Sequence, residues 1–413
     1  MDSMQLLNPW WKEAKVNHLL AKLYKRKALI KLKHLMKFRQ ITIISGLRRV
    51  GKSTLMYQII EQLLESKVKA ENIFYYTFDE KVDTISALLS NYQQLTTIDW
   101  KKEKCYIFFD EIQKFPNWSN QLKMIYDSFP QLKIIISGSS SFELEKEAKL
   151  NLAGRHFVVN VEPLTFIEYL ELKQSKIDLN KQLLWEEEIK REFQNYLIRP
   201  FPEIVDYQDI SLIRNYIRDN IIEKVVKIDL YKKFGYVNID LITRLIDLFY
   251  DNPGSYINYD ELSSELKVSK KTLLLHIYYL EFAYVIRRIH NYRPNIRTVT
   301  RKLQRIYPYH WSLQFAWNGN INVETITATF FDAKYYWRKE QKEVDFLIIK
   351  EKDIIPIEVK EAKLLQKSEL SSFYYFINKF KSKQAIIIYN GKEAKETVNK
   401  TIVKKIPLFK LFL

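Results

Sequence analysis

The chain has 413 residues, of which 47% are hydrophobic and 28% are charged, and this ordinary globular composition predicts two or three domains. Its net charge of +17 favours a polyanionic partner, with nucleic acid ahead of an anionic membrane surface. The single cysteine, Cys105, excludes an internal disulfide and fits a reducing compartment.

The first part of the chain is expected to be a helical segment over residues 1–38. Its mixture of acidic and basic residues lacks the apolar core and the small-residue cleavage site of a signal peptide. Elsewhere the apolar runs have the length of strands, far short of the ~20 residues that a membrane span needs. We therefore expect a cytoplasmic protein without a membrane span.

A phosphate-binding loop is predicted directly after the first strand-like run, QITIIS at 40–45. The run leads into GLRRVGKST and then into a helical pattern, and a strand, a glycine-bounded loop and a helix are the context that such a loop needs. The G-x-x-x-x-G-K-[ST] pattern is complete. The residues predicted to bind the nucleotide are Gly46, Leu47, Arg48, Arg49, Val50, Gly51, Lys52, Ser53 and Thr54.

Each residue type in this loop has a chemical reason to be there. Gly46 and Gly51 let the backbone wrap closely, so that amide hydrogens face the phosphates at the amino end of a helix. Lys52 is expected to neutralise the β- and γ-phosphates, the Ser53 hydroxyl to ligate Mg²⁺, and Thr54 to lie near the α-phosphate. ATP and Mg²⁺ are the cofactors that this pattern predicts.

A second acidic element follows in CYIFFDEIQKF at 105–115. A continuous apolar run is typical of a buried parallel strand, and acids at its carboxyl end lie where open α/β sheets bind ligands. Asp110 is expected to hold Mg²⁺ through water, and Glu111 to orient and activate the attacking water. The second acid favours hydrolysis over nucleotide binding alone.

Three more strand-like runs complete the predicted sheet, at 73–78, 133–137 and 156–161. In additional-strand P-loop enzymes a strand with a polar sensor separates the loop strand from the acid strand, and we expect the parallel order 5-1-4-3-2. Ser137 is the expected sensor, with Ser139 as the alternative. Arg155 is a candidate arginine finger, in the same molecule or for a neighbouring subunit, unless it is a solvated arginine at the start of a strand.

The strings GLRRVGKST, FFDEIQKFPNW, IIISGSSS and LAGRHFVVNVEPLTFIEYL, with EVDFLI and PIEVK near the end, resemble prokaryotic AAA+-type (AAA_14-like) ATPases paired with a DUF4143 domain. The resemblance covers nearly the whole chain. It implies an ATP-hydrolysing core, a winged-helix segment and a restriction-endonuclease-like, PD-(D/E)xK-type carboxyl domain. Because such relatives often form rings, a homo-oligomer stays open. The chain departs from the family pattern at Arg199-Pro200 and at His310.

The expected domains are an ATPase core at 39–165, a helical lid at 166–234, a winged helix at 235–290 and a nuclease-like domain at 291–413. In the winged helix, Leu273, Ile277 and Leu280 fit the buried face of the second helix of a helix-turn-helix. The basic residues expected to point outward toward phosphates are Lys270, Lys271 and His276. DNA binding and a packing module with a solvated basic face are equal alternatives here.

The last domain carries the acids of a possible second metal site. Nuclease folds of the restriction-endonuclease type place a helix acid, an Asp and a Glu-x-Lys on adjacent elements. Here these would be Glu324, Asp345 and Glu358, with Lys360 as the catalytic base or charge stabiliser and Mg²⁺ or Mn²⁺ as the metal. The alternative for Glu358 and Lys360 is an exposed pair on one strand face.

Together these patterns predict an α/β protein, an AAA+-like P-loop ATPase followed by a lid, a winged helix and a restriction-endonuclease-like domain. We expect a Mg²⁺-dependent ATPase that couples its nucleotide state to the binding or processing of nucleic acid, DNA rather than RNA. The alternative is a nucleotide-gated switch whose nuclease-like domain is catalytically inert and binds a protein partner.

Overall fold

The computed structural model describes residues 2–78, 82–138, 147–148, 150–293, 304–350 and 353–413. The chain divides into two compact units. Unit 1 contains Met1–Leu164 and Phe201–Glu203, and unit 2 contains Thr165–Pro200 and Ile204–Leu413. Apart from Phe201–Glu203, the three regions expected after residue 165 therefore lie in one unit. Among the described residues, no helix has both the length and the apolar character required to cross a lipid bilayer.

Unit 1 is built on a five-stranded parallel sheet in the order β2-β3-β4-β1-β5, which read from the β5 edge is the predicted order 5-1-4-3-2. The five strands are almost continuously apolar because their faces are covered by helices. Their bounds are β1 (Ile41–Ser45), β2 (Ile73–Thr77), β3 (Tyr106–Asp110), β4 (Lys133–Gly138) and β5 (His156–Asn160).

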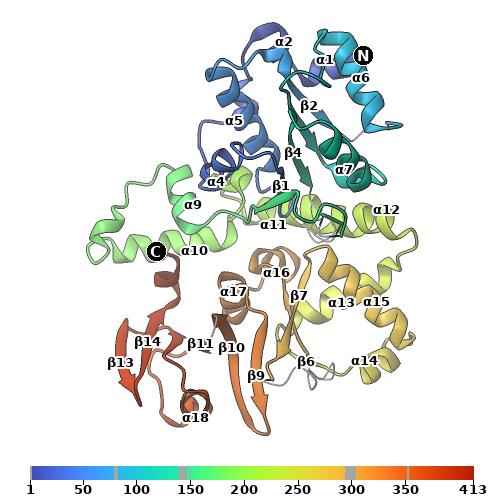
Figure 1. Ribbon diagram of the computed structural model, residues 1–413. Coiled ribbons are helices and arrows are strands. Elements are labelled where there is room, and N and C mark those ends of the chain that lie inside the picture. Colours follow the sequence, from blue (N-terminus) through green and yellow to red (C-terminus); the bar gives the residue numbers. More distant parts are fainter. Residues whose placement is uncertain (1, 79–81, 139–146, 149, 294–303, 351–352) are drawn as a thin grey trace. The chain divides into compact units, whose positions relative to one another are not determined.

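Helices cover both faces of this sheet. Figure 1 shows α4 (Ala28–Leu35) and α5 (Lys52–Glu65) on one side and α6 (Ile85–Thr96) and α7 (Trp118–Ser128) on the other. This division follows from right-handed crossovers, since β1 to β2 runs in the opposite direction across the sheet from β2 to β3 and β3 to β4. The helices bury an aromatic core that includes Phe74, Tyr92 and Phe109.

The amino-terminal segment protects the free edge of β2. It contains three short helices, α1 (Asp2–Leu7), α2 (Trp10–Glu13) and α3 (His18–Ala21). The Asn8 side chain donates to the Tyr75 carbonyl at 2.9 Å and accepts from the Tyr75 amide at 2.7 Å. The indoles of Trp10 and Trp11 both donate to the carbonyl of Ile73. Backbone groups of an edge strand are thereby satisfied, which fixes the position of Tyr75.

Unit 2 contains a nine-stranded mixed sheet in the order β13-β14-β12-β11-β10-β9-β7-β8-β6. The strands are β6 (Tyr256–Ile257), β7 (Ile286–Asn291), β8 (Gln304–Pro308), β9 (Tyr335–Lys339), β10 (Lys342–Lys350), β11 (Asp353–Lys360), β12 (Gln384–Tyr389), β13 (Ala394–Val398) and β14 (Thr401–Pro407).

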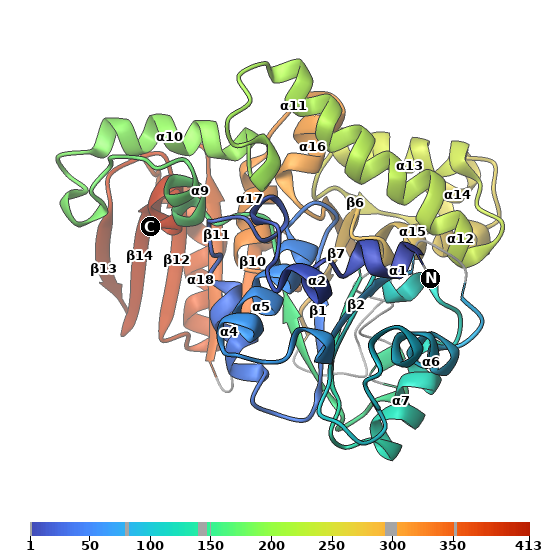
Figure 2. The same cartoon turned by 90° about the horizontal axis from the view of Figure 1, so that it is seen from above.

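Helices of unit 2 flank this sheet (Figure 2). They are α9 (Phe166–Leu172), α10 (Glu186–Ile198), α11 (Ile210–Ile217), α12 (Leu230–Phe234), α13 (Ile239–Asp251), α14 (Tyr259–Glu265), α15 (Lys270–Phe282), α16 (Trp311–Asn318), α17 (Val323–Phe330) and α18 (Ser371–Phe380). Two π-helical stretches, Arg218–Glu223 and Val225–Asp229, connect α11 to α12. At the start of α16, the ring of His310 accepts from the Ser312 amide, so the departure at this position serves as a helix cap.

The region expected to be a winged helix has the element order α13-β6-α14-α15-β7-β8, with β8 antiparallel to both β6 and β7. The β7 strand also pairs in parallel with β9, so this small sheet continues into that of the last domain. The expected boundary at residue 290 therefore falls within one sheet. Residues 294–303, between β7 and β8, lie outside the described part of the chain.

The buried face of α15 follows the prediction, since Leu273, Ile277 and Leu280 are fully buried. The prediction for His276 is wrong, because its ring is buried and its Nε2 accepts from the Asn238 amide at 3.2 Å. Of the two lysines, Lys270 is paired with Asp260 at 2.7 Å and Lys271 is exposed.

Candidate functional site

The loop between β1 and α5 has a backbone that requires glycine. Gly46 has a φ of 149°, and a Cβ there would lie 2.1 Å from the carbonyl oxygen of Val161, just after β5. Gly51 has a φ of 92° and caps the amino end of α5 in the left-handed region. The loop therefore closes tightly onto the sheet, and the first amides of a 14-residue helix point into it.

Lys52 is folded over this loop. Its side chain is buried, and its Nζ donates to the carbonyl oxygens of Gly46 at 3.0 Å and Leu47 at 2.7 Å. In this arrangement the two carbonyls accept hydrogen bonds that the Lys52 ammonium group would donate to phosphate oxygens once a nucleotide is bound. Lys52 is thus held at the mouth of the loop, ready to exchange partners.

The Asp110 carboxylate, at the carboxyl end of β3, accepts hydrogen bonds from hydroxyl groups on three different elements. Ser53 of α5 donates to its Oδ2 at 2.5 Å, and Ser137 of β4 donates to its Oδ1. Tyr75 of β2 donates to Oδ2 at 2.9 Å. A hydroxyl beside a carboxylate is the hard oxygen donor set that Mg²⁺ prefers, so Ser53 and Asp110 fit the predicted ion.

Glu111 lies next to this group and adopts a left-handed φ of 52°. Its Oε2 accepts from the Gln113 amide at 2.6 Å. Burial by itself would raise the pKa of Glu111, but the positive charges of Lys52, Lys114 and Arg48 outweigh burial and lower it. Glu111 is therefore an ionised carboxylate beside the phosphate loop, in the state that can accept a proton.

Arg155 is not brought to this cluster. Arg155 precedes β5, whose first residues pair with the beginning of β1. It therefore lies at the amino-terminal ends of the strands, whereas the phosphate loop lies at their carboxyl ends, about 15 Å away by strand rise. There its guanidinium forms a bidentate ion pair with the Asp127 carboxylate, through hydrogen bonds of 2.8 and 3.1 Å. This placement does not support an arginine finger in the same molecule, and a role toward a neighbouring subunit stays a prediction. The alternative sensor, Ser139, lies outside the described residues.

Two residues of this site were missed by sequence reasoning. Tyr75 reaches Asp110 from the edge strand, and its ring packs against Tyr57 with centroids 4.9 Å apart. The buried guanidinium of Arg26 donates to the carbonyls of Val50 in the loop at 2.8 Å and of Glu162 after β5 at 2.9 Å. No motif marks either residue, because both act from segments distant in sequence.

The acids predicted in the last domain come from neighbouring elements of unit 2. Glu324 lies in the first turn of α17, Asp345 in β10, and Glu358 and Lys360 in β11. The Asp345 carboxylate accepts from the amide of Val359 at 2.8 Å, which places it beside Glu358. Lys360 pairs with the Oε1 of Glu358 at 2.7 Å. The predicted residues are therefore close to one another.

A buried arginine that the sequence did not reveal lies among these acids. Arg305, in β8, contacts Glu324 at 2.7 Å, Glu343 at 3.2 Å and Asp345 at 3.7 Å. Its side chain is only 9% exposed, and the rings of Tyr256, Tyr307 and Tyr336 surround its guanidinium. Tyr307 also donates to Glu324 at 2.6 Å. Arg305 therefore serves as the cation that these carboxylates share.

The predicted metal site of Glu324, Asp345 and Glu358 stays a prediction, because in this arrangement Arg305 contacts two of its three carboxylates. Within the described ranges, no three His, Cys, Asp or Glu side chains are grouped so as to hold a metal ion. The physical reason is that Arg305 spans Glu324 and Asp345, so that a guanidinium fills the space between them.

Negative charge nevertheless remains in surplus at this cluster. Four carboxyl groups face two cations, Arg305 and Lys360. Burial and then the charges of Glu358 and Glu324 raise the pKa of Asp345 well above its usual value. The Oε2 atom of Glu358 is buried and has no hydrogen-bond partner among the described residues.

Three family models match the chain. An AAA domain model matches residues 38–170, a domain of unknown function (DUF8612) matches 190–319, and a domain of unknown function (DUF4143) matches 324–409. The first match covers the sheet of unit 1 with its phosphate loop and acids. The second joins regions that the sequence had divided among a lid, a winged helix and the start of the last domain.

Three curated relatives are described as uncharacterized proteins. An uncharacterized protein of Methanocaldococcus jannaschii, MJ1544, is 24% identical and aligns over 77% of this chain and 74% of its own length. An uncharacterized protein of Haemophilus influenzae is 27% identical over 61% of this chain, and MJ1637 of M. jannaschii is 27% identical over 65%. The chain spans 62% and 60% of the lengths of these last two relatives.

Two solved structures show distant similarity. The Walker-type ATPase PABY2304 of Pyrococcus abyssi is 16% identical, with 72% of this chain and 99% of that chain covered and a TM-score of 0.38. The S. cerevisiae Hsp104:casein complex is 12% identical, with 65% and 52% covered and a TM-score of 0.32. The assignment of unit 1 rests instead on the match at residues 38–170 and on its own geometry. On these grounds, this part of the chain contains an AAA-type P-loop ATPase domain.

Proposed function

We propose that unit 1 binds and hydrolyses ATP with Mg²⁺. The observation that supports this most is the convergence of Lys52, Ser53 and Asp110 beside an ionised Glu111 at one edge of the sheet. Lys52 and Ser53 come from the start of α5, Asp110 and Glu111 come from the end of β3, and hydrolysis requires all of them together.

The residues of unit 1 divide the work as follows. The loop amides and Lys52 bind the phosphates, exchanging the carbonyls of Gly46 and Leu47 for phosphate oxygens. Ser53 and Asp110 would hold Mg²⁺, which neutralises the charge that develops on the transferred phosphoryl group. Glu111 orients the attacking water and accepts its proton. Ser137, which donates to Asp110 here, would sense the terminal phosphate through that carboxylate.

Two substitutions test this assignment. Lys52→Ala is expected to abolish ATP turnover, because the phosphates lose their positive partner. Glu111→Gln is expected to retain ATP binding and to trap the bound nucleotide, because the amide cannot accept the proton. Steady-state phosphate release and filter-retained radiolabelled ATP measure the two effects. Hydrolysis at the parent rate by Lys52→Ala would remove the central assignment.

For unit 2 we propose a winged helix joined to a restriction-endonuclease-like domain that acts on nucleic acid, DNA rather than RNA, under the control of the nucleotide state. The element order α17-β9-β10-β11-α18-β12 and the neighbouring Asp345, Glu358 and Lys360 support the second part. The order α13-β6-α14-α15-β7-β8 supports the first.

Arg305 favours a second candidate function, in which the nuclease-like domain is inert and the protein acts as a nucleotide-gated switch with a protein partner. A guanidinium among Glu324, Glu343 and Asp345 leaves no group of three acids for a metal within the described chain. A plasmid-nicking assay with Mn²⁺ separates the two candidates, with Asp345→Ala as the comparison. Nicking by the parent that Asp345→Ala loses supports cutting, and no nicking in any nucleotide state supports the switch.

A further inference from the structure

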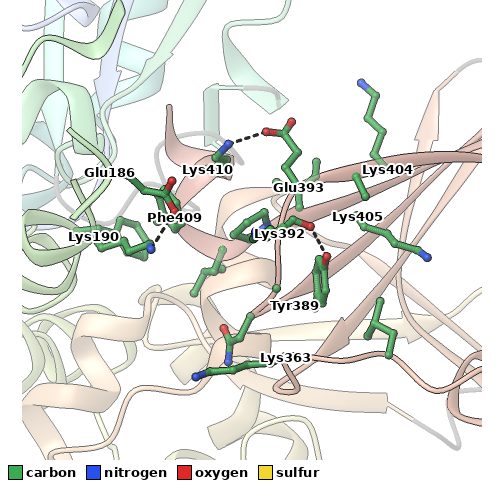
Figure 3. A pocket seen from close by; sticks show the side chains of 18 of the residues that line it. Glu186, Lys190, Lys363, Tyr389, Lys392, Glu393, Lys404, Lys405, Phe409 and Lys410 are labelled. Atoms are coloured by element: carbon green, nitrogen blue, oxygen red, sulfur yellow. Dashed lines mark hydrogen bonds and ion pairs between the residues drawn. The ribbon is translucent and has the colours of Figure 1, made fainter. Parts of the chain in front are cut away.

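A large basic pocket lies in unit 2, and none of the acids of the cluster around Arg305 lines it. It has a volume of about 1760 Å³ and is lined by α10, by the β13–β14 hairpin and by the segments that follow β11, β12 and β14 (Figure 3). Eight basic and three acidic residues line it. Small-molecule sites typically measure about 300–1000 Å³, so the pocket suits an extended ligand.

Only part of this positive charge is neutralised by the protein. Lys190 pairs with Glu186 at 2.9 Å, and Lys410 pairs with Glu393 at 2.8 Å. Four other lining lysines form no ion pair with any residue in the described ranges: Lys363, Lys392, Lys395 and Lys404. The hydrogen bond from Lys190 lowers the pKa of Glu186, and the charges of Lys410 and Lys392 lower it further. Positive potential from separate segments therefore converges on this pocket.

The pocket begins one strand away from the acidic cluster. In the parallel strands β11, β12 and β14, Lys360 pairs with Tyr389 and Tyr389 pairs with Pro407. Tyr389 and Pro407 line the pocket, whereas Lys360 belongs to the cluster with Glu358. Neighbouring strands are about 4.8 Å apart, so the lining of the pocket begins beside the strand that carries Glu358 and Lys360.

Apolar side chains accompany the charge. Leu183 and Leu364 are 84% and 85% exposed at the pocket lining, and the ring of Phe409 lies 5.8 Å from the Nζ of Lys190. Lysines that track a backbone, interleaved with apolar and aromatic faces for bases, are the features of single-strand binding sites. The carboxylates of an acidic peptide would pair with the lysines but would not cover the apolar side chains of Leu183, Leu364 and Phe409.

We propose that this basic pocket binds single-stranded nucleic acid, with Lys363, Lys392, Lys395 and Lys404 contacting the phosphodiester backbone. The proposal rests on the nucleic-acid role proposed for unit 2 and not on ATP hydrolysis in unit 1. The strand would run along the sheet edge toward Lys360, whether or not the acidic cluster cuts it.

The test measures binding of the full chain to a fluorescein-labelled single strand of 20 nucleotides by fluorescence anisotropy, in EDTA without nucleotide. The double variant Lys363→Gln/Lys404→Gln is expected to bind about tenfold more weakly at low salt. It should also flatten the slope of log K against log salt by about 1.4, since two phosphate contacts are lost. The variant Lys12→Gln/Lys33→Gln, with the same charge change at exposed positions of unit 1, should bind like the parent.

Several outcomes would overturn the proposal. Parent-like binding by the pocket variant would do so, as would loss of binding in Lys271→Gln alone, which would place the strand on α15. Equal competition by poly-glutamate or by phosphatidylserine vesicles would show a general polyanion surface. If the parent binds no strand, the nucleic-acid role of unit 2 fails as well. Phosphate release, assayed separately, reports on ATP hydrolysis, and unchanged thermal unfolding shows that the variants fold.

Discussion

Replacing Arg305 by Met tests whether the guanidinium of this arginine occupies the position of a divalent metal ion among the acids of unit 2. Met preserves much of the packing against the three tyrosine rings but leaves Glu324, Glu343 and Asp345 without their shared partner. Removing one member of a buried ion pair costs about 3–5 kcal/mol, because the remaining charge stays buried. For a unit of this size that loss corresponds to a decrease in Tm of roughly 6–20 °C.

Divalent cations should reverse this loss if the guanidinium occupies a cation site. An ion that binds only the folded state at about 100 times its Kd restores about 2.7 kcal/mol. We therefore expect Mn²⁺ to raise the Tm of Arg305→Met by several degrees more than that of the parent, as measured by differential scanning calorimetry without nucleotide. The orphaned Oε2 of Glu358 and the surplus negative charge are the groups that Mn²⁺ would satisfy.

Arg287 provides a matched control. It lies on the neighbouring strand β7, its side chain is also 9% exposed, and it bonds to Asp332 and to the carbonyls of Tyr309 and Ala328. Arg287→Met should lose comparable stability without rescue by Mn²⁺, because only one carboxylate is involved. The reasoning fails if Arg305→Met is as stable as the parent, or if Mn²⁺ stabilises both proteins equally.

Three further predictions concern single contacts. Tyr75→Phe removes the hydroxyl that donates to Asp110, a charged hydrogen bond of about 1.5–3 kcal/mol, and should raise the Mg²⁺ concentration needed for half-maximal ATPase activity about tenfold; an unchanged Mg²⁺ titration would contradict this. Arg26→Met leaves the carbonyls of Val50 and Glu162 without a buried donor and should cost unit 1 about 2–4 kcal/mol, seen as a lower denaturant midpoint with an unchanged slope. The raised pKa of Asp345 means that the folded state holds a proton which the unfolded state releases near 3.8, so stability from this group is present below that pH and is lost as the pH rises. Asp345→Asn should therefore reduce the loss of stability as the pH rises above 3.8, and equal slopes in the two proteins would argue against a raised pKa.

The phosphate loop and its acids were predictable from the sequence because their chemistry is local. The spacing from Gly46 to Ser53 specifies a strand, a turn with unusual φ angles and a helix, and these lie within one stretch of chain. Asp110 ends an apolar strand, so parallel pairing alone places it at the same edge as the loop. The position of Ser137 beside Asp110 follows from the same kind of pairing between β3 and β4.

The failed prediction at His276 has a specific cause. Sequence spacing identified the apolar stripe of α15 but did not show that Asn238, which caps the start of α13, has a backbone amide that needs an acceptor. The amide of Asn238 finds that acceptor in the ring of His276, so a residue expected at the surface is buried. Propensity and periodicity describe one helix, whereas burial depends on its neighbours.

The sequence by itself determined the strand order of unit 1, the loop between β1 and α5, and the four residues of the last domain that lie close together. The tertiary structure decided what surrounds them. Arg305 reaches acids 19 to 40 residues away in sequence, Tyr75 reaches Asp110 from an edge strand, and the basic pocket joins α10 to the ends of three distant strands. Local backbone preferences fix a motif within a few residues, but Coulomb interactions depend on distance in space, which only the folded sheet sets.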